Sequence, residues 1–366
     1  MRCNLAKALV DAGDADAALA ACDIAISTSD SHPFALATKG AVLTDLEQYR
    51  DALGLLRAAS EQLPDDMTLV NLALCQDALN DPATAANSLR QAIKINAFNA
   101  RAVADLSNCL VKLDAAAEAI GLCEQFLVQH PGECLVIGSL ALALNAAGHH
   151  EQATRLTDCD RLVKTFRLDP PGSAGSAEEL NALLAETICN DESLLNDPVS
   201  KSTFGGSQTG ELDFEATAEL RELRQFIDRS VRQSVADLLA DDLGNHPIMT
   251  QHSDRWSLRG WGTVLGSGGR QTSHMHPLGW LSGVYYARVP AGMGDGGEKN
   301  AGALSFGIAP KRFYQSHPAD TCYQPEPGLL VLFPSWFWHQ TIPFAANDTR
   351  ISIAFDVMPD NSLRML

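Results

Sequence analysis

Three histidines near the C-terminal end of the sequence have the residue type and spacing of a metal site. His274 and His276 are two residues apart and precede the run WLSGVYYARV, which has the composition of a β-strand. Side chains at positions i and i+2 of a strand point to the same face, so these two imidazoles can converge on one metal ion. His339 follows a second apolar run, GLLVLF, and is the candidate for a third ligand.

An arginine close to these histidines has the features of an anion-binding residue. Arg350 begins the strand-like run RISIAFDV, eleven residues after His339. Arg350 and Ser352 share one face of this strand, while the opposite face is apolar. Because a buried guanidinium is costly unless it meets an anion, the pattern indicates that an anion binds there.

The combined pattern resembles the iron(II) and 2-oxoglutarate-dependent oxygenases. It consists of a His-x-His before a strand, a distal histidine 63 residues after His276, and an Arg-x-Ser that begins at Arg350. The phrases SGVYY and LFPSWFWH are similar in particular to a bacterial group of 2-oxoglutarate oxygenases. The resemblance runs from NDPVSKSTFGGSQTGEL to the end of the sequence. It implies a double-stranded β-helix, which is a cupin-like jelly-roll barrel with iron in its open mouth.

The resemblance also implies roles for individual residues and two cofactors. It makes His274 and His339 ligands of Fe(II), and it places His276 where the family usually has aspartate or glutamate. It makes Arg350 the partner of the distal carboxylate of 2-oxoglutarate, with Ser352 beside it. We therefore expect Fe(II), 2-oxoglutarate and O2 at this site, and no catalytic side chain beyond the metal site.

Two details of this site stay open at the level of sequence. Asp295 and Asp320 are alternative third ligands, but both lie in polar loops that contain glycine or proline, so we favour the three histidines. Three histidines leave one more positive charge than two histidines with a carboxylate, and zinc or copper would also suit these donors. Either Tyr285 or Tyr286 is expected to reach the cosubstrate, and we assign Tyr285, although Pro277 interrupts the strand register.

The first 165 residues repeat with a period of 33 or 34 residues. An alanine marks each repeat, and a small residue lies twelve positions before it. These alanines are Ala18, Ala52, Ala85, Ala119 and Ala153. Small side chains at fixed positions allow two antiparallel helices to pack closely in each repeat. The spacing resembles the tetratricopeptide repeat (TPR), although leucine, cysteine or alanine fills most of its usual aromatic positions.

The periodicity ends at a linker that divides the chain. The stretch RLDPPGSAGSAEEL is rich in turn-forming residues, and Ser176 with Glu179 forms a capping-box pattern that begins a helix. Short apolar runs in the C-terminal third leave no room for helices between strands, which favours an all-β barrel or sandwich. We therefore expect a multidomain α + β chain, with a TPR-like helical solenoid at 1–166, a linker and helix at 167–200, and an oxygenase-like barrel domain at 201–366.

Composition restricts the class of partner and the compartment. The chain has 366 residues, with 45 acidic and 27 basic side chains and a formal charge of −18, so neither nucleic acid nor an anionic membrane surface is an expected partner. Its nine cysteines include no Cys-x-x-Cys pair, which argues against a disulfide framework or a zinc knuckle. No apolar run approaches the roughly 20 residues of a membrane-spanning helix. A reducing, cytoplasmic location is expected.

The functional expectation follows from the two parts together. We expect a dioxygenase that hydroxylates or demethylates a substrate, with a protein or peptide held in the concave groove of the repeats. One alternative is a catalytically silent adaptor whose barrel is structural or sensing. Another is a three-histidine metal dioxygenase that does not use 2-oxoglutarate. The pair Arg350 and Ser352 counts against this last alternative, because such an enzyme has no need of a carboxylate clamp.

Overall fold

The computed structural model divides the chain into two compact units. It describes residues 2–11, 14–27, 32–168, 176–198, 201–293, 300–314 and 321–360. The helical unit comprises residues 1–153 with two short additions, 199–201 and 311–316. The sheet unit comprises the ranges 154–198, 202–310 and 317–366.

The division differs in detail from the expected domain boundaries. The solenoid was expected to extend to residue 166, but residues 164–167 form a strand that pairs within the sheet. The segment 177–189 is a helix that packs on this sheet and is therefore part of the sheet unit. Most of the expected linker, at 169–175, lies outside the described residues, as do Asp295 and Asp320.

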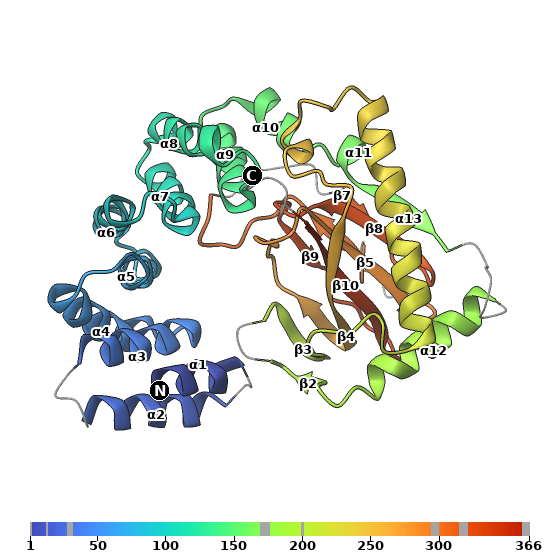
Figure 1. The fold of residues 1–366 in the computed structure, drawn as a ribbon, viewed down its shortest axis with the longest axis horizontal. Coiled ribbons are helices and arrows are strands. Elements are labelled where there is room, and N and C mark those ends of the chain that lie inside the picture. Colours follow the sequence, from blue (N-terminus) through green and yellow to red (C-terminus); the bar gives the residue numbers. More distant parts are fainter. Residues whose placement is uncertain are drawn as a thin grey trace. The chain divides into compact units, whose positions relative to one another are not determined.

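The described residues of 2–157 form consecutive pairs of antiparallel helices, as the sequence period predicts, and only the last four residues of the last helix are assigned to the sheet unit (Figure 1). The pairs are α1 (Arg2–Asp11) with α2 (Ala15–Ser27), α3 (Pro33–Asp45) with α4 (Tyr49–Gln62), α5 (Asp66–Ala78) with α6 (Pro82–Ile95), α7 (Ala100–Lys112) with α8 (Ala116–Gln129), and α9 (Cys134–Ala146) with α10 (His150–Thr157). The arrangement is that of TPR-like repeats.

Small residues hold the two helices of each pair close together. The five marker alanines of the repeat are between 0% and 1% exposed. At Gly40, a Cβ atom would lie 2.5 Å from Cγ of Leu56 in the partner helix, so only glycine allows this approach. Within four pairs, the turn contains a residue with φ between 57° and 79°. These residues are Glu47, Asn80, Asp114 and Gly148.

The sheet unit contains two antiparallel sheets. The larger has the strand order β1-β8-β5-β10-β4-β3-β2, and the smaller has the order β7-β6-β9. The strands are β1 (Lys164–Arg167), β2 (Leu195–Asn196), β3 (Thr203–Gln208), β4 (Trp256–Gln271), β5 (Leu281–Arg288), β6 (Leu304–Phe306), β7 (Thr321–Tyr323), β8 (Leu329–Pro334), β9 (His339–Thr341) and β10 (Arg350–Pro359). Two antiparallel sheets of this kind fit a β-sandwich.

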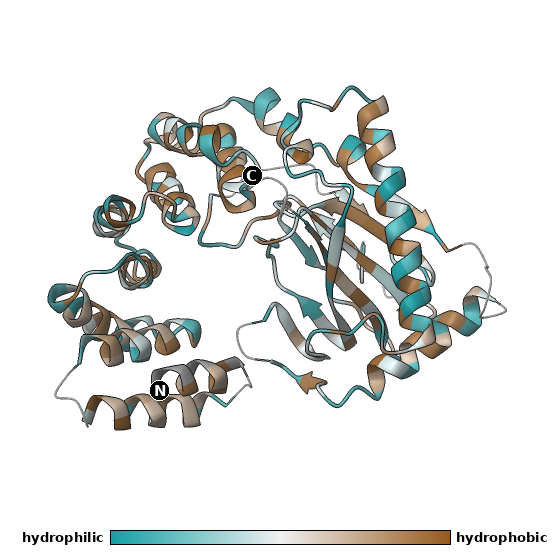
Figure 2. Cartoon of the chain, in the orientation of Figure 1, coloured by the Kyte–Doolittle hydropathy of each residue, from teal (hydrophilic) through white to brown (hydrophobic). Residues whose placement is uncertain are grey.

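Helices complete the sheet unit. They are α11 (Cys159–Leu162), α12 (Ala177–Cys189), α13 (Ala218–Ala240) and the short 3-10 helix η1 (Pro247–Met249). The predicted cap is confirmed, because Oγ of Ser176 accepts a hydrogen bond from the backbone N–H of Glu179 at 3.1 Å. Figure 2 shows polar and apolar residues alternating along α13, whose buried stripe includes Leu223 and Ile227. No helix among the described residues is long and apolar enough to cross a membrane.

The central strand β10 carries the predicted anion-binding residues Arg350 and Ser352. It pairs with β4 along its whole length and with β5 over most of it. In this register Arg350 lies opposite Leu265, and Ser352 lies opposite Thr263 on one side and Tyr286 on the other. All but the last two residues of β10 are buried, so polar groups on it must find partners inside the unit.

Candidate metal centre

Backbone pairing brings the three histidines together. His274 and His339 form an antiparallel bridge, in which each backbone N–H donates to the other's carbonyl at 3.0 and 2.9 Å. The backbone N–H of His276 donates to the carbonyl of Ser335 at 3.0 Å. One ligand nitrogen from each imidazole lies within 4.8 Å of the other two. The expected convergence of these three side chains is therefore present in the structure.

Hydrogen bonds determine which nitrogen carries the proton in the imidazoles of His274 and His339. Nδ1 of His274 lies 2.7 Å from the carbonyl oxygen of Thr272, and Nδ1 of His339 lies 2.9 Å from that of Phe337. Because a carbonyl can only accept, each Nδ1 carries the proton and each Nε2 keeps a lone pair. This tautomer is the one in which Nε2 can bind a metal ion.

His276 is held by a carboxylate instead of a carbonyl. Its Nδ1 forms a hydrogen bond with Oδ1 of Asp356, which also accepts from the Ser282 hydroxyl at 2.7 Å. The Ser335 hydroxyl lies 2.8 Å from that of Ser282 and continues the network. A carboxylate behind a ligand imidazole fixes the orientation of the ring and makes its other nitrogen more basic.

Burial keeps two of the imidazoles neutral. His274 is partly exposed, yet the surrounding protein lowers its pKa to about 3, and His276 adds to the shift. Burial, assisted by His274 and His276, also holds the pKa of His339 well below its ordinary value. Neutral imidazole is the form that binds a metal cation, so these two residues need not lose a proton to do so.

Arg350 is a buried cation without a protein anion. It is 1% exposed, its Nη1 donates to the Gly302 carbonyl at 2.9 Å, and its Nη2 donates to the Thr341 hydroxyl at 3.2 Å. Its Nε has no hydrogen-bond partner, and no carboxylate forms an ion pair with it, among the residues that the structure describes. Burial lowers its pKa, as expected for a charge removed from water.

One narrow cavity connects the arginine to the imidazoles. The residues that line it are Trp261, Gln271, His274, His276, Gly283, Val284, Tyr286, Leu304, Phe333, His339, Thr341, Arg350 and Ala354. Its volume is about 20 Å³, so a ligand larger than water requires lining side chains to move. The three imidazoles and the guanidinium of Arg350 therefore line a common space, and the Ser202 hydroxyl lies 3.5 Å from Nε2 of His274.

Comparison with known proteins identifies a family for the part of the sheet unit that contains this cavity. Residues 259–356 match the protein family described as "Putative 2OG-Fe(II) oxygenase". The sheet unit carries a 2OG-Fe(II) oxygenase family domain. The matched range of this oxygenase domain includes the three histidines, Arg350 and Asp356. No curated protein matches the sequence.

Solved structures with a likeness to the chain include both helical and oxygenase proteins. YrrB, described as a TPR protein with an unusual peptide-binding site, is 22% identical, with 43% of this chain and 84% of YrrB covered and a TM-score of 0.38. MamA is 19% identical, with 43% and 86% covered and a TM-score of 0.39. A Pseudomonas putida prolyl-4-hydroxylase is 14% identical, with 56% and 96% covered and a TM-score of 0.38.

The structure places Tyr285, the tyrosine that we assigned to the cosubstrate, outside the cavity lined by the histidines and Arg350. Tyr285 points away from the cavity, and its hydroxyl donates to Oδ1 of Asn181 in α12 at 2.5 Å, while its ring packs against Phe226 of α13. The neighbouring Tyr286 lines the cavity instead. Adjacent strand residues face opposite sides, so one position of uncertainty in the register exchanges the two tyrosines. Ser352 is 1% exposed and is not among the described lining residues, so its role stays a prediction.

Asp356 is the residue that sequence reasoning missed. It lies six positions after Arg350 on the same strand, and an even separation places both on one face. An aspartate within the apolar run RISIAFDV needs a buried partner, and that need was the available signal. The identity of the partner, His276, depends on strand pairing across 80 residues of sequence.

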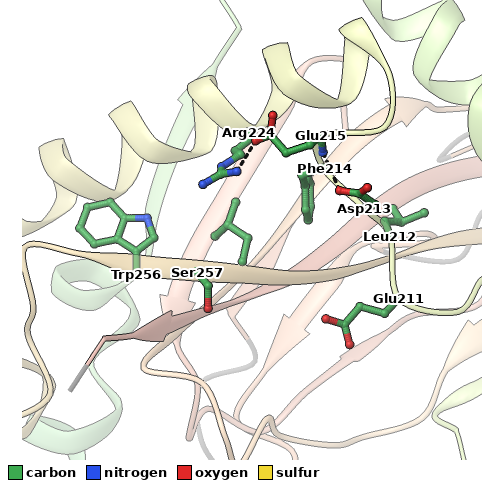
Figure 3. Close-up of a pocket in the computed structure, with 9 residues that line it drawn as sticks. Glu211, Leu212, Asp213, Phe214, Glu215, Arg224, Trp256 and Ser257 are labelled. Carbon is green, nitrogen blue, oxygen red and sulfur yellow. Dashed lines mark hydrogen bonds and ion pairs between the residues drawn. The ribbon is translucent and has the colours of Figure 1, made fainter. Parts of the chain in front are cut away.

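A larger cleft of the sheet unit has no histidines among its described lining residues (Figure 3). It has a volume of about 410 Å³ and lies among residues 211–215, the beginning of β4 and α13. Several of its polar groups have protein partners: Arg224 forms an ion pair with Glu215, and the Trp256 indole N–H donates to Asp228 at 2.8 Å. We therefore place the candidate site at the histidines and not at this cleft.

Proposed function

We propose that the sheet unit is a non-haem iron(II), 2-oxoglutarate-dependent dioxygenase with the fold of a double-stranded β-helix. One observation carries the proposal: the cavity that collects three imidazoles also contains Arg350, a buried cation for which the described protein supplies no anion. A metal ion and a carboxylate ligand would satisfy both features together. The family match of residues 259–356 supports the same conclusion.

The ligand set suits Fe(II) and leaves room for a second molecule. His274, His276 and His339 would bind the ion through Nε2, and three protein ligands leave coordination positions open for a chelating 2-oxo acid. When bound, iron(II) would activate O2 and 2-oxoglutarate would supply two electrons by decarboxylation to succinate, so that one oxygen atom of O2 enters a substrate C–H bond and the other enters succinate. The protein's part is to hold neutral imidazoles in place and to keep bulk water from the cavity.

The carboxylate behind His276 offsets the departure from two histidines and one carboxylate. Asp356 accepts a hydrogen bond from Nδ1 of His276, so a carboxylate lies one hydrogen bond behind the proposed third ligand. A divalent ion and Arg350 together carry three positive charges, while Asp356 and 2-oxoglutarate carry three negative ones. The loaded cavity is therefore electrically neutral, which low-dielectric surroundings favour.

Arg350 is prepared to bind the distal carboxylate of the cosubstrate. The Gly302 carbonyl and the Thr341 hydroxyl hold its two terminal nitrogens, which fixes the direction of the guanidinium. The planar fork of arginine matches a carboxylate, and the unpaired Nε remains available as a donor. Binding would exchange a buried, unbalanced charge for an ion pair.

Anaerobic titration of the iron-loaded protein with 2-oxoglutarate tests the proposal. We expect a visible charge-transfer band from chelated cosubstrate, and its absence in His339→Ala. Release of succinate under aerobic, iron-replete conditions would then follow. A protein that binds iron but shows neither band nor succinate would be the silent adaptor, and one that oxidises substrate without 2-oxoglutarate would be the three-histidine alternative.

For the helical unit, we propose that the repeats bind a protein or peptide, as an array of paired helices with a concave face allows. The substrate would then be a segment of that protein, presented to the cavity of the sheet unit.

A further inference from the structure

A short segment from far along the chain is seated on the repeats. Residues 311–314, with the sequence KRFY, belong to the helical unit and are called the docked segment below. Nη1 of Arg312 lies 3.7 Å from Oδ1 of Asp105 in α7, and the amide of Asn108 donates to the Arg312 carbonyl at 3.4 Å. The repeats thus contact both the side chain and the backbone of this arginine.

An apolar contact follows the arginine. Phe313 is 7% exposed, and with Tyr314 it lines a small cavity whose other walls include Val111 of α7 and Leu142 of α9. The arginine itself lines a neighbouring cavity with Asp77 of α5. These two neighbouring cavities, called the groove below, therefore offer an acidic position for a guanidinium next to an apolar position for an aromatic ring.

The docked segment leaves part of the groove unused. The ion pair with Asp105 is long at 3.7 Å and the Arg312 side chain is 36% exposed, so water screens the pair and it holds the docked segment weakly. Asn108 is only 6% exposed, yet its Oδ1 accepts no hydrogen bond among the described residues. A buried asparagine amide can both donate and accept, and an extended peptide offers a carbonyl and an N–H for these two bonds.

We propose that this groove binds a partner protein segment in which an arginine is followed by aromatic residues, and that the docked segment is an internal ligand that the partner displaces. Charge favours such a partner, because Oδ1 of Asp105 faces the arginine position while its Oδ2 pairs with Arg101, and the chain as a whole is strongly acidic. The proposal goes beyond the oxygenase function and does not depend on it, since binding requires neither iron nor 2-oxoglutarate.

Competition between the docked segment and an added peptide provides the test. The probe is a fluorescent peptide GIAPKRFY, which is the sequence of residues 307–314, added to the purified full chain without metal. The double variant Arg312→Ala, Phe313→Ala weakens the docked segment and should bind the peptide about tenfold more tightly than the parent protein, because the groove is then open in a larger fraction of molecules. The exposed neighbour Lys311 provides a matched control, and Lys311→Ala should leave the affinity unchanged.

Two further measurements decide whether the peptide occupies the groove. In the double variant, adding Asn108→Ala should weaken peptide binding, with circular dichroism melting as the check that the chain still folds. A peptide in which alanine replaces its arginine leaves the protein untouched and should bind at least about tenfold more weakly. Equal affinity of parent and double variant, equal affinity of the two peptides, or no binding at millimolar peptide would each overturn the proposal.

Discussion

Buried charge is compensated differently at Asp77 and Asp105 in the helical unit and at Arg350 in the sheet unit. In the helical unit, Asp77 is 9% exposed and forms an ion pair with Lys112 at 2.7 Å, and Asp105 forms one with Arg101 at 2.7 Å. In the sheet unit, Arg350 is more deeply buried and has no anionic partner among the described residues. A charge that its own fold neutralises contributes to structure, whereas one left unbalanced in a cavity indicates a missing ligand.

The two units also differ in how far apart in the sequence their contacting residues lie. Contacts in the repeats join neighbouring helices, so the period of the sequence determines them directly. The candidate metal centre collects residues from positions 274, 276, 339, 350 and 356, which only the pairing of distant strands brings together. The repeats can therefore be predicted from the local sequence pattern. The site can be predicted only where a known motif indicates which distant residues come together.

Removing a metal ligand should produce the largest effect on the sheet side of this comparison. His339→Ala deletes one of three Nε2 donors, and we expect iron affinity to fall by more than the roughly 10- to 100-fold typical of losing a residue that merely supports a ligand. Iron content after dialysis measures the result. His252→Ala removes a histidine of the same unit outside the cavity and should retain iron. Full iron occupancy in His339→Ala would refute the ligand assignment.

Removing the Arg350 side chain tests whether this residue binds a carboxylate of 2-oxoglutarate. Arg350→Ala should weaken binding of 2-oxoglutarate by roughly 10- to 100-fold, or about 1.5 to 3 kcal/mol, as expected for hydrogen bonds to a charged group. Calorimetry on the iron-loaded protein gives the dissociation constant, and iron affinity should stay close to that of the parent. Unchanged cosubstrate binding would mean that Arg350 has another role.

Asp356→Asn sharpens the comparison by keeping shape while removing charge. The amide can present its oxygen to Nδ1 of His276 but lacks the negative charge that makes the imidazole a better donor. We expect iron affinity to fall by about tenfold, the lower part of the range for residues behind a ligand. If Asp356→Ala and Asp356→Asn both bind iron like the parent, the carboxylate does not support the third ligand.

The smallest expected effects are on stability, and they separate the two kinds of buried charge. Asp77→Asn leaves Lys112 unpaired, and because Lys112 is 28% exposed the free energy of unfolding should fall by only about 1 kcal/mol. Arg350→Met removes a buried, unbalanced charge, so the metal-free protein should not be destabilised. Urea unfolding of both variants measures the difference. Equal losses would show that Arg350 is already compensated by its hydrogen bonds.

Much of the architecture could be predicted from the sequence because its signals are local. The alanine period gave the helix pairs, and the capping pattern at Ser176 gave the beginning of α12. The predicted boundary at residue 166 falls within the strand Lys164–Arg167, which pairs with Leu329–Leu332, a contact that no local pattern reports. The expected cytoplasmic location and the substrate remain predictions.

The proximity of the candidate site residues was predictable as far as their motif extends. His274, His276, His339 and Arg350 were identified by type and spacing, and the structure brings them to one cavity, while their roles remain predictions. Tyr286 lines this cavity and Tyr285 does not, a distinction that required the strand register after a proline, and Asp356 was missed for lack of the same information.

The backbone bridge between His274 and His339 has a consequence for how an ion would bind. Two reciprocal hydrogen bonds hold these two residues together in the absence of an ion. The backbone of two candidate ligands is therefore already ordered, so less conformational entropy would be lost when an ion binds.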